Sequence, residues 1–513
     1  MLEQLVTAPM RQAAAATAFS DIQFDIGAFI NPAQIRNDGA GNVTVQFGPV
    51  FTMFIPAKLN RTPTKADQAN LANALNTIEA SYPASPSGLF VASVSYGLPY
   101  FNRLPQSLVQ ANMPRLTSNN GRFVLEEAVP FPTDVTGGFV GGPNALIPGQ
   151  TKDRFNVNVV IENNDMLFQF RSDSMVNLAA IPLWFSGSNN LNGKGVPSPN
   201  LNGLLTFQTQ RIQFVQPGMP RQIANNYGLE FAPRINPNSS MAMGFVDQQT
   251  DSSAAAPIVT FAGVNSKVAM TTARAGDYFD NGSIAHFSHV IEDLYQFYST
   301  PNQDSNRPGG EPFTERVQYM FRSNQLGTAN GVPHAGFTDQ FTNGGGPAFI
   351  NNVFQGTNAA LLQAQDQNNV VFGTGAGQQQ SLSATFTGLP RVGHEEALQQ
   401  VSRASDGTPL HVRNDGPGFD GMDVPAFRTF PGNNGANLPA GTNVFKLEFL
   451  MFVPTADLFA QMRTKVAAQD LQHQFLGDQD DDNGLERFIT ATRRQNFLTP
   501  PRRHRTFPLL ELT

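Results

Sequence analysis

The order of strand-like and helix-like segments is the feature that most constrains what this sequence can fold into. Residues 65–82 place Leu71, Leu75 and Ile78 on one face of a predicted helix. A second helix is predicted at 174–185, running toward Trp184, and Pro182 should break it. Strand patterns, in which apolar and polar residues alternate or β-branched and aromatic residues prevail, occur at 43–58, 88–97, 154–163 and 165–173.

Strand, helix, strand, followed again by strand, helix, strand, is the order of a ferredoxin-like unit, whose helices cover one face of an antiparallel sheet. A similar series then restarts, with a strand at 257–263, a helix at 282–298, a strand at 443–454 and a helix at 455–471. The sequence therefore predicts an α+β fold made of two ferredoxin-like halves, each an antiparallel sheet with helices packed on it.

The 513 residues are enough for two domains. We expect an N-terminal arm at 1–20, a first ferredoxin-like domain at 21–240 and a second at 241–513. The second domain is interrupted at about 299–390 by a region rich in Gly, Asn and Gln. Loops of this length in compact domains are usually functional or disordered, and we expect a lid or a subunit contact.

Charge and cysteine content exclude several classes of function. The formal net charge is −7 and the only basic block lies near the C-terminus, so no electrostatic footprint for nucleic acid is present. The absence of cysteine excludes disulfides, thiolate catalysis and cysteine-ligated metals. No apolar run predicts a membrane span, and the N-terminus lacks an export-signal pattern. We predict a soluble, cytoplasmic protein.

Common catalytic signatures are missing, since the sequence has no Gly-x-Ser-x-Gly elbow, phosphate loop or dinucleotide fingerprint. His286 and His289 lie three residues apart on the predicted helix at 282–298, and Glu292 lies three further on. On a helix this is metal-ligand spacing. The alternative is that these residues form the polar side of an ordinary helix.

Two other residues stand out by their local sequence. Asp247 follows the apolar end of "MGFVD", where it either lies at the edge of a pocket or caps the next turn. His411 lies in a loop dense in Gly, Pro, Asn and Asp, around a short extended "LHVR". An imidazole there either ligates iron, oriented by a neighbouring carboxylate, or bonds loop carbonyls. Candidates for the orienting carboxylate are Asp415, Asp420 and Asp423.

Several of these segments resemble the dye-decolourising peroxidase superfamily. The stretch "GFVDQQTDSS" is similar to its Gly-x-x-Asp-Gly signature: Gly244 and Asp247 match, and Gln248 replaces the last glycine. The loop "GTPLHVRNDGPG" resembles the one that carries the proximal haem histidine. Residues 156–174, 281–298 and 444–463 resemble the strands and helices around these motifs, in the same chain order.

The resemblance implies haem b bound in the second half, with His411 as the axial iron ligand and Asp247 as the distal acid. Arg428, which follows His411 by 428 − 411 = 17 positions, would be the distal arginine, and Arg413 is nearer but shares the proximal loop. The implied activity is reduction of hydrogen peroxide with oxidation of phenolic or dye-like donors, in a homo-oligomer. Trp184 and the tyrosines are either electron routes or ordinary aromatic residues. The alternative is a haem-free protein that uses the fold for assembly or binding.

Overall fold

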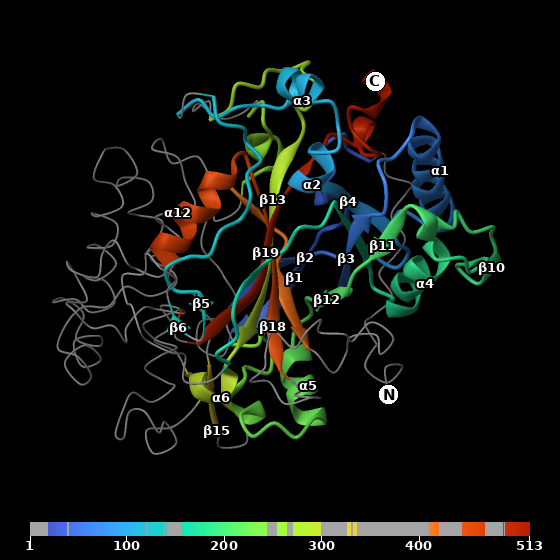
Figure 1. The fold of residues 1–513 in the computed structure, drawn as a ribbon. Coiled ribbons are helices and arrows are strands. Elements are labelled where there is room, and N and C mark those ends of the chain that lie inside the picture. Colours follow the sequence, from blue (N-terminus) through green and yellow to red (C-terminus); the bar gives the residue numbers. More distant parts are fainter. Residues whose placement is uncertain are drawn as a thin grey trace.

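The computed structural model describes residues 19–37, 41–118, 121–137, 139–140, 155–243, 254–263, 270–298, 326–329, 332–335, 410–419, 444–466, 486 and 488–513. Within these ranges the fold is α+β, as the sequence predicts. Its centre is one largely antiparallel sheet of 11 strands (Figure 1). Helices α1 (Lys65–Ser81) and α4 (Met175–Phe185) lie at one side of the molecule and α12 (Ala456–Val466) at the other. All three contribute to the same large apolar cluster.

The first half of the chain has the strand order of a ferredoxin-like unit. Its elements are, in chain order, β3 (Phe51–Leu59), α1 (Lys65–Ser81), β4 (Phe90–Gly97), β8 (Met166–Ser172), α4 (Met175–Phe185) and β12 (Arg211–Phe214). In the sheet the strands stand in the order β12-β3-β8-β4, and each pair of neighbours is antiparallel. The last strand of the unit thus lies beside the first, as the predicted strand and helix order requires.

The second half repeats this arrangement. Its elements are β13 (Ser283–Glu292), β17 (Gly416–Phe419), β18 (Phe445–Val453), α12 (Ala456–Val466) and β19 (Ile489–Thr499). The strands stand in the order β19-β13-β18-β17, again with antiparallel neighbours. The connection between β13 and β17 falls mostly outside the described residues, and so does most of the predicted insertion at 299–390.

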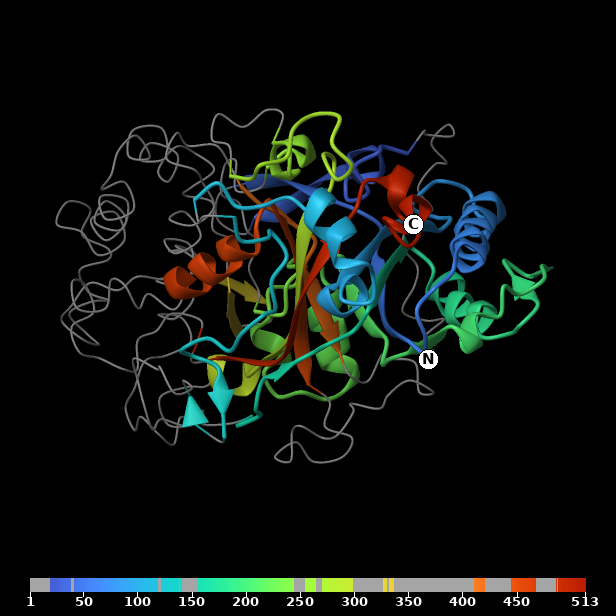
Figure 2. The ribbon, with the colours of Figure 1, turned by 45° about the horizontal axis from the view of Figure 1, so that its top comes forward.

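The two halves meet edge to edge and close the strands into a ring (Figures 1 and 2). At one edge β19 pairs with β4. At the other edge β12 lies beside β17, where a Cβ on Gly418 would be 2.5 Å from the Ile212 carbonyl oxygen. Inward-facing side chains meet across the ring, because the rings of Phe54 and Phe287 lie 4.6 Å apart. Since one sheet joins both halves, the domain boundary near residue 240 stays a prediction.

Local sequence explains the two helices of the first half. Helix α1 starts at a capping box in which Thr64 and Asp67 each accept a hydrogen bond from the other's backbone N–H. Its apolar face is buried as predicted. Helix α4 is capped by Ser174 and runs from Met175 through Pro182 to Phe185, so the predicted break is wrong. Pro182 lies in the last turn, so its missing N–H removes one hydrogen bond, to the Leu178 carbonyl, and only three residues of the helix follow it.

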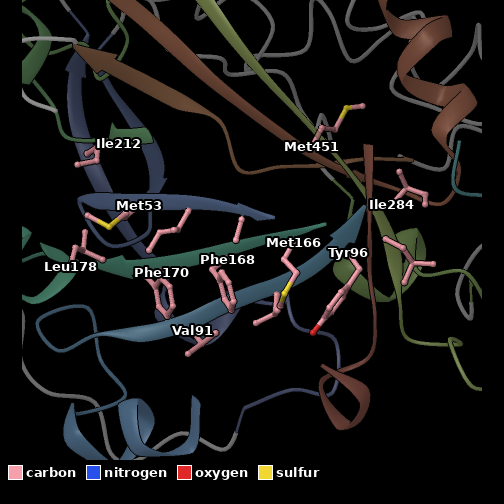
Figure 3. Close-up of a cluster of buried hydrophobic side chains, with 14 of the residues drawn as sticks. Met53, Val91, Tyr96, Met166, Phe168, Phe170, Leu178, Ile212, Ile284 and Met451 are labelled. Carbon is pink, nitrogen blue, oxygen red and sulfur yellow. The ribbon is translucent and has the colours of Figure 1, made fainter. Parts of the chain in front are cut away.

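The outer face of the sheet is the larger part of the core. Side chains of neighbouring strands project toward α1 and α4, as Figure 3 shows for Met53, Val91, Phe168 and Phe170. Trp184 belongs to this layer: it is 1% exposed, and its Nε1 donates to the Val196 carbonyl at 3.1 Å. Trp184 is therefore a core residue.

A second apolar cluster, separate from the outer layer, lies inside the ring. Phe54 and Leu167 enter it from the first half, and Phe287, Phe452 and Phe497 from the second. On each strand the residues in this cluster alternate with residues in the outer layer, which is the two-residue period of a strand buried on both faces. Ile22, Phe24, Val259, Ala285 and Leu450 complete the cluster.

The structure corrects two predicted elements of the second half. Residues 282–298 form strand β13 and the short helix α6 (Leu294–Phe297), so the predicted long helix is wrong. Every residue of β13 is buried, and this two-sided burial produced an apolar pattern that resembles a helix. The predicted strand at 257–263 is also wrong, since Ala256–Val259 form a 3-10 turn with Pro257 in its first positions.

Other strands differ from the predictions in their bounds. The strand predicted at 43–58 is divided into β2 and β3, and the one predicted at 154–163 is reduced to β7. The remaining described elements are β1 (Asn31–Asn37), β2 (Gly41–Phe47), α2 (Leu98–Phe101), α3 (Gln106–Asn112), β5 (Val135–Thr136), β6 (Phe139–Val140), β7 (Val160–Ile161), β9 (Asn190–Leu191), β10 (Lys194–Gly195), β11 (Leu205–Phe207), α5 (Met219–Asn226), β14 (Leu326–Ala329), β15 (Val332–Ala335) and β16 (Val412–Arg413).

Candidate functional site

His411 lies at the edge of the ring, directly before strand β16. The extended conformation predicted for this segment is confirmed, since Val412 pairs with Phe452 of β18. His411 is 2% exposed, and its carbonyl oxygen accepts the N–H of Ala254 at 2.8 Å. Val412 packs against the apolar cluster inside the ring. The backbone of His411 is therefore held from both sides.

The hydrogen bond from Ala254 connects His411 with the segment that carries Asp247. Ala254 follows Asp247 by 254 − 247 = 7 positions, and 411 − 254 = 157 positions separate it from His411. Asp247 and Arg428 themselves lie outside the described residues, as do Gln248, Asp420 and Asp423. The structure thus places Ala254, the first described residue after the 244–253 motif, against His411, while the motif itself lies outside the described residues.

Of the three carboxylates considered for orienting His411, only Asp415 is described. It is partly buried, between β16 and β17. Burial raises the pKa of Asp415, and the positive charge of Arg413 acts in the opposite direction. A role for Asp415 in orienting the imidazole stays a prediction.

The metal site considered at His286, His289 and Glu292 does not form. On strand β13 residues three apart point to opposite faces, so the two histidines are separated by the sheet. Nδ1 of His286 bonds to Asn496 Oδ1 at 2.7 Å, outside the ring. Nδ1 of His289 bonds to Thr492 Oγ1 at 2.6 Å. Burial lowers the pKa of both imidazoles well below the ordinary value, so both are neutral at pH 7.

A network of buried charges lies inside the ring. Glu162 accepts Arg211 Nη2 at 2.5 Å and Arg493 Nη1 at 3.2 Å. Lys446 Nζ lies 3.5 Å from Glu448 Oε1, and this oxygen is 3.8 Å from His289 Nε2. Ion pairs removed from water are retained only where partners compensate for lost hydration, so the network fixes how the two halves fit together.

Arg171 of β8 belongs to the same interior but is bonded differently. It is 4% exposed, and its Nη1 donates to the neutral Oδ1 of Asn414 at 2.5 Å. Nε2 of Gln213 donates to the backbone carbonyl of Asn414 at 2.9 Å. Burial lowers the pKa of Arg171 to about 10, so the guanidinium keeps its charge at pH 7. These contacts hold Asn414, three residues after His411, against the first half.

The sequence analysis missed this polar interior. Its signal is present in "DMLFQFRSD" and "RIQF", where Gln and Arg occupy every second position of an otherwise apolar strand. In an open sheet such an alternation indicates a solvated face. In a closed ring the second face points inward instead, so alternating polar residues become buried ones.

The donor chemistry at His411 fits a haem iron, because a buried imidazole on a fixed backbone is a common axial ligand. At 2% exposure, however, a porphyrin reaches the His411 ring only if the chain that covers it moves. Among the described residues, no group of three or more histidines and carboxylates is placed to hold a metal ion.

The comparisons with known proteins add a family and a set of similar folds. A family of unknown function, DUF7405, matches residues 145–332, a little over a third of the chain. None of the curated proteins matches the chain significantly by sequence. In the part of the chain that the structure describes, no helix is both long and apolar enough to cross a membrane.

The chain is similar over most of its length to solved DyP-type peroxidases. A putative DyP-type peroxidase from Shewanella oneidensis is 12% identical, with 94% of this chain and 99% of that chain covered and a TM-score of 0.42. The encapsulated DyP-type peroxidase from Mycobacterium smegmatis is 12% identical, with coverages of 93% and 98% and a TM-score of 0.39. The dye-decolorizing peroxidase from Bacteroides thetaiotaomicron VPI-5482 is 13% identical, with the same coverages and a TM-score of 0.39.

Proposed function

We propose that the protein is a haem-dependent peroxidase of the dye-decolourising type, which reduces hydrogen peroxide and oxidises phenolic or dye-like donors. The supporting observation is the hydrogen bond between Ala254 and His411, because Ala254 directly follows the segment that the family resemblance requires near the haem histidine. His411 would be the axial ligand of the iron. A homo-oligomeric assembly and a cytoplasmic location stay predictions.

Haem, when bound, would supply the redox chemistry. His411 would hold the iron through one ring nitrogen, on a backbone fixed by Ala254. Asp247 would accept a proton from one oxygen of hydrogen peroxide and return it to the other. Arg428 would offset the negative charge that develops as the O–O bond breaks. The apolar cluster beside Val412 would exclude water.

Replacing the predicted distal acid tests this proposal. Haem-loaded protein should oxidise a phenolic donor with hydrogen peroxide, and Asp247→Asn should lower kcat by about 100-fold or more, since general acid-base catalysis contributes that much. Asp251→Asn, four residues further along the same polar segment, is the matched control and should retain activity. Full activity in Asp247→Asn, or none in the haem-loaded wild type, would contradict the proposal.

A haem-free role in assembly or binding is the second candidate. The near-complete burial of His411 favours it, because its imidazole is already covered. Titration of the full chain with haemin separates the two. Protein that is colourless as purified, and that shows no Soret band after haemin is added, would support the second candidate.

A further inference from the structure

Four buried side chains inside the ring carry nitrogen atoms that donate to no group of the described residues. The atoms are Nε of Arg171, Nη1 of Arg211, Nε2 of Gln169 and Nδ2 of Asn414. None of these residues is more than 7% exposed. Buried donors are nearly always bonded to protein, water or ligand. The four nitrogen atoms therefore indicate a bound partner that offers acceptor atoms.

The register of the sheet places the four donors together. Gln169 and Arg211 both pair with Phe54 of β3, so they stand in one row on either side of that strand. Arg171 follows Gln169 by two residues on β8 and shares its inward face. Asn414 arrives from the second half and is bonded to Arg171. Each donor residue thus shares a row, a strand or a hydrogen bond with another donor residue.

The charges inside the ring favour an anion over water as that partner. Four cationic side chains lie inside the ring, those of Arg171, Arg211, Lys446 and Arg493. The carboxylates in contact with them are the buried Glu448 and the partly buried Glu162, which follows β7. Glu162 pairs with Arg211 and Arg493. Glu448 pairs with Lys446.

Arg171 is the cation without an ion pair among the described residues. Asp173 acts on it from a distance, but this carboxylate is partly exposed and accepts the N–H of Val50 at 2.8 Å. The side chain of Arg171 is also confined, since a Cβ on Gly48 would lie 2.9 Å from its Nη2. The guanidinium is thus fixed in place, and among the described residues only the more distant Asp173 offsets its charge. Desolvated charges are rarely left without a direct partner.

We propose that a small tetrahedral oxyanion, of the phosphate or sulfate kind, binds inside the ring between Arg171, Arg211, Gln169 and Asn414. Guanidinium groups match the oxygen spacing of such anions, and the two amides donate to the remaining oxygens. The anion would join β8 and β12 of the first half to the β16 to β17 segment of the second. It would therefore stabilise the contact on which the position of His411 depends.

The direct test is anion-dependent stability of the full chain, followed by calorimetric titration with inorganic phosphate. Phosphate and sulfate should raise Tm above its value in chloride at equal ionic strength, because a ligand that binds only the folded state stabilises it. An equal Tm in all three salts would show that water alone occupies the site and would overturn the proposal.

Two variants locate the effect. Arg171→Gln should weaken phosphate binding by about tenfold or more, since a charge-assisted hydrogen bond is lost. Gln169→Glu places a carboxylate among the donors, and Ser93 Oγ, which donates to Gln169 Oε1 at 3.0 Å, remains satisfied. This variant should have a raised Tm in chloride and no response to phosphate.

Arg505→Gln is the matched control, because Arg505 is also buried and charged but pairs with Glu79 near the C-terminus. It should keep the full phosphate response. If Arg171→Gln fails to fold, Gln169→Glu decides the question. A phosphate response of wild-type size in either folded variant would place the anion elsewhere and overturn the proposal.

Discussion

Replacing Glu292 with glutamine should stabilise the protein, and the gain should grow as the pH rises. Glu292 ends strand β13 and is 6% exposed. Its Oε2 accepts no hydrogen bond from the described residues. Burial raises the pKa of this carboxyl from its ordinary value to about 8. The folded protein therefore favours the protonated form.

The magnitude follows from proton linkage. The pKa of Glu292 is higher in the folded than in the unfolded protein, so its full stabilising effect is present below the unfolded pKa and is lost as pH rises toward the folded value. In that window the free energy of unfolding should fall by about 1.4 kcal/mol per pH unit. Between about pH 5 and pH 7 the loss is about 3 kcal/mol. Glutamine does not ionise, so Glu292→Gln should not show this loss of unfolding free energy.

Urea unfolding followed by tryptophan fluorescence measures this effect, because the chain has a single tryptophan, Trp184, and it is buried. Wild type and Glu292→Gln should have similar unfolding free energies near about pH 5 and diverge steadily up to about pH 8. Glu127→Gln, which removes an exposed carboxyl, is the control and should follow the wild type. Parallel curves for Glu292→Gln and wild type would refute the reasoning.

Three further substitutions test the ring and its helices. Phe287→Ala removes a fully buried ring that contacts Phe54, and should lower the free energy of unfolding in urea by about 3 to 5 kcal/mol; a loss below about 1 kcal/mol would mean that the ring interior is not packed. Gly418→Ala forces a Cβ against the Ile212 carbonyl and should lower Tm in a thermal scan, whereas Gly195→Ala, where a Cβ meets nothing, should not. Thr64→Ala removes the cap of α1 and should cost about 1 kcal/mol in the same urea assay; no cost would mean that the capping box is not formed.

Local sequence predicts much of the first half and less of the second. Helix α1 and strands β4 and β8 follow from period and capping, because one face of each is apolar and its ends carry turn residues. Strand β13 was assigned to a helix because burial of both faces hides the two-residue period. Strand β19 was not predicted at all. Its sequence, "ITATRRQNFLT", is polar, and its arginines are buried only because Glu162 and Asp134 reach them from distant parts of the chain.

The candidate site also contains one part that local sequence predicts and one part that it does not. A motif placed His411 in an extended segment, and the structure confirms that segment. The alternation of polar residues in β8 and β12 is visible in the sequence, but it does not show that Arg171, Arg211 and Asn414 meet, because they do so only when the ring closes. Residues that become neighbours through closure are separated by tens to hundreds of positions, and no pattern within a short window can predict such contacts.

The most direct test of the proposed function is the absorption spectrum of the full chain after reconstitution with haemin, compared between wild type and His411→Ala. We predict a histidine-ligated haem spectrum in the wild type and in His504→Ala, a control near the C-terminus whose Nδ1 bonds Glu511 at 2.9 Å. His411→Ala should lose that spectrum while keeping its fold by circular dichroism. A wild type that takes up no haemin, or a His411→Ala spectrum identical to the wild type, would contradict the assignment of His411 as the iron ligand.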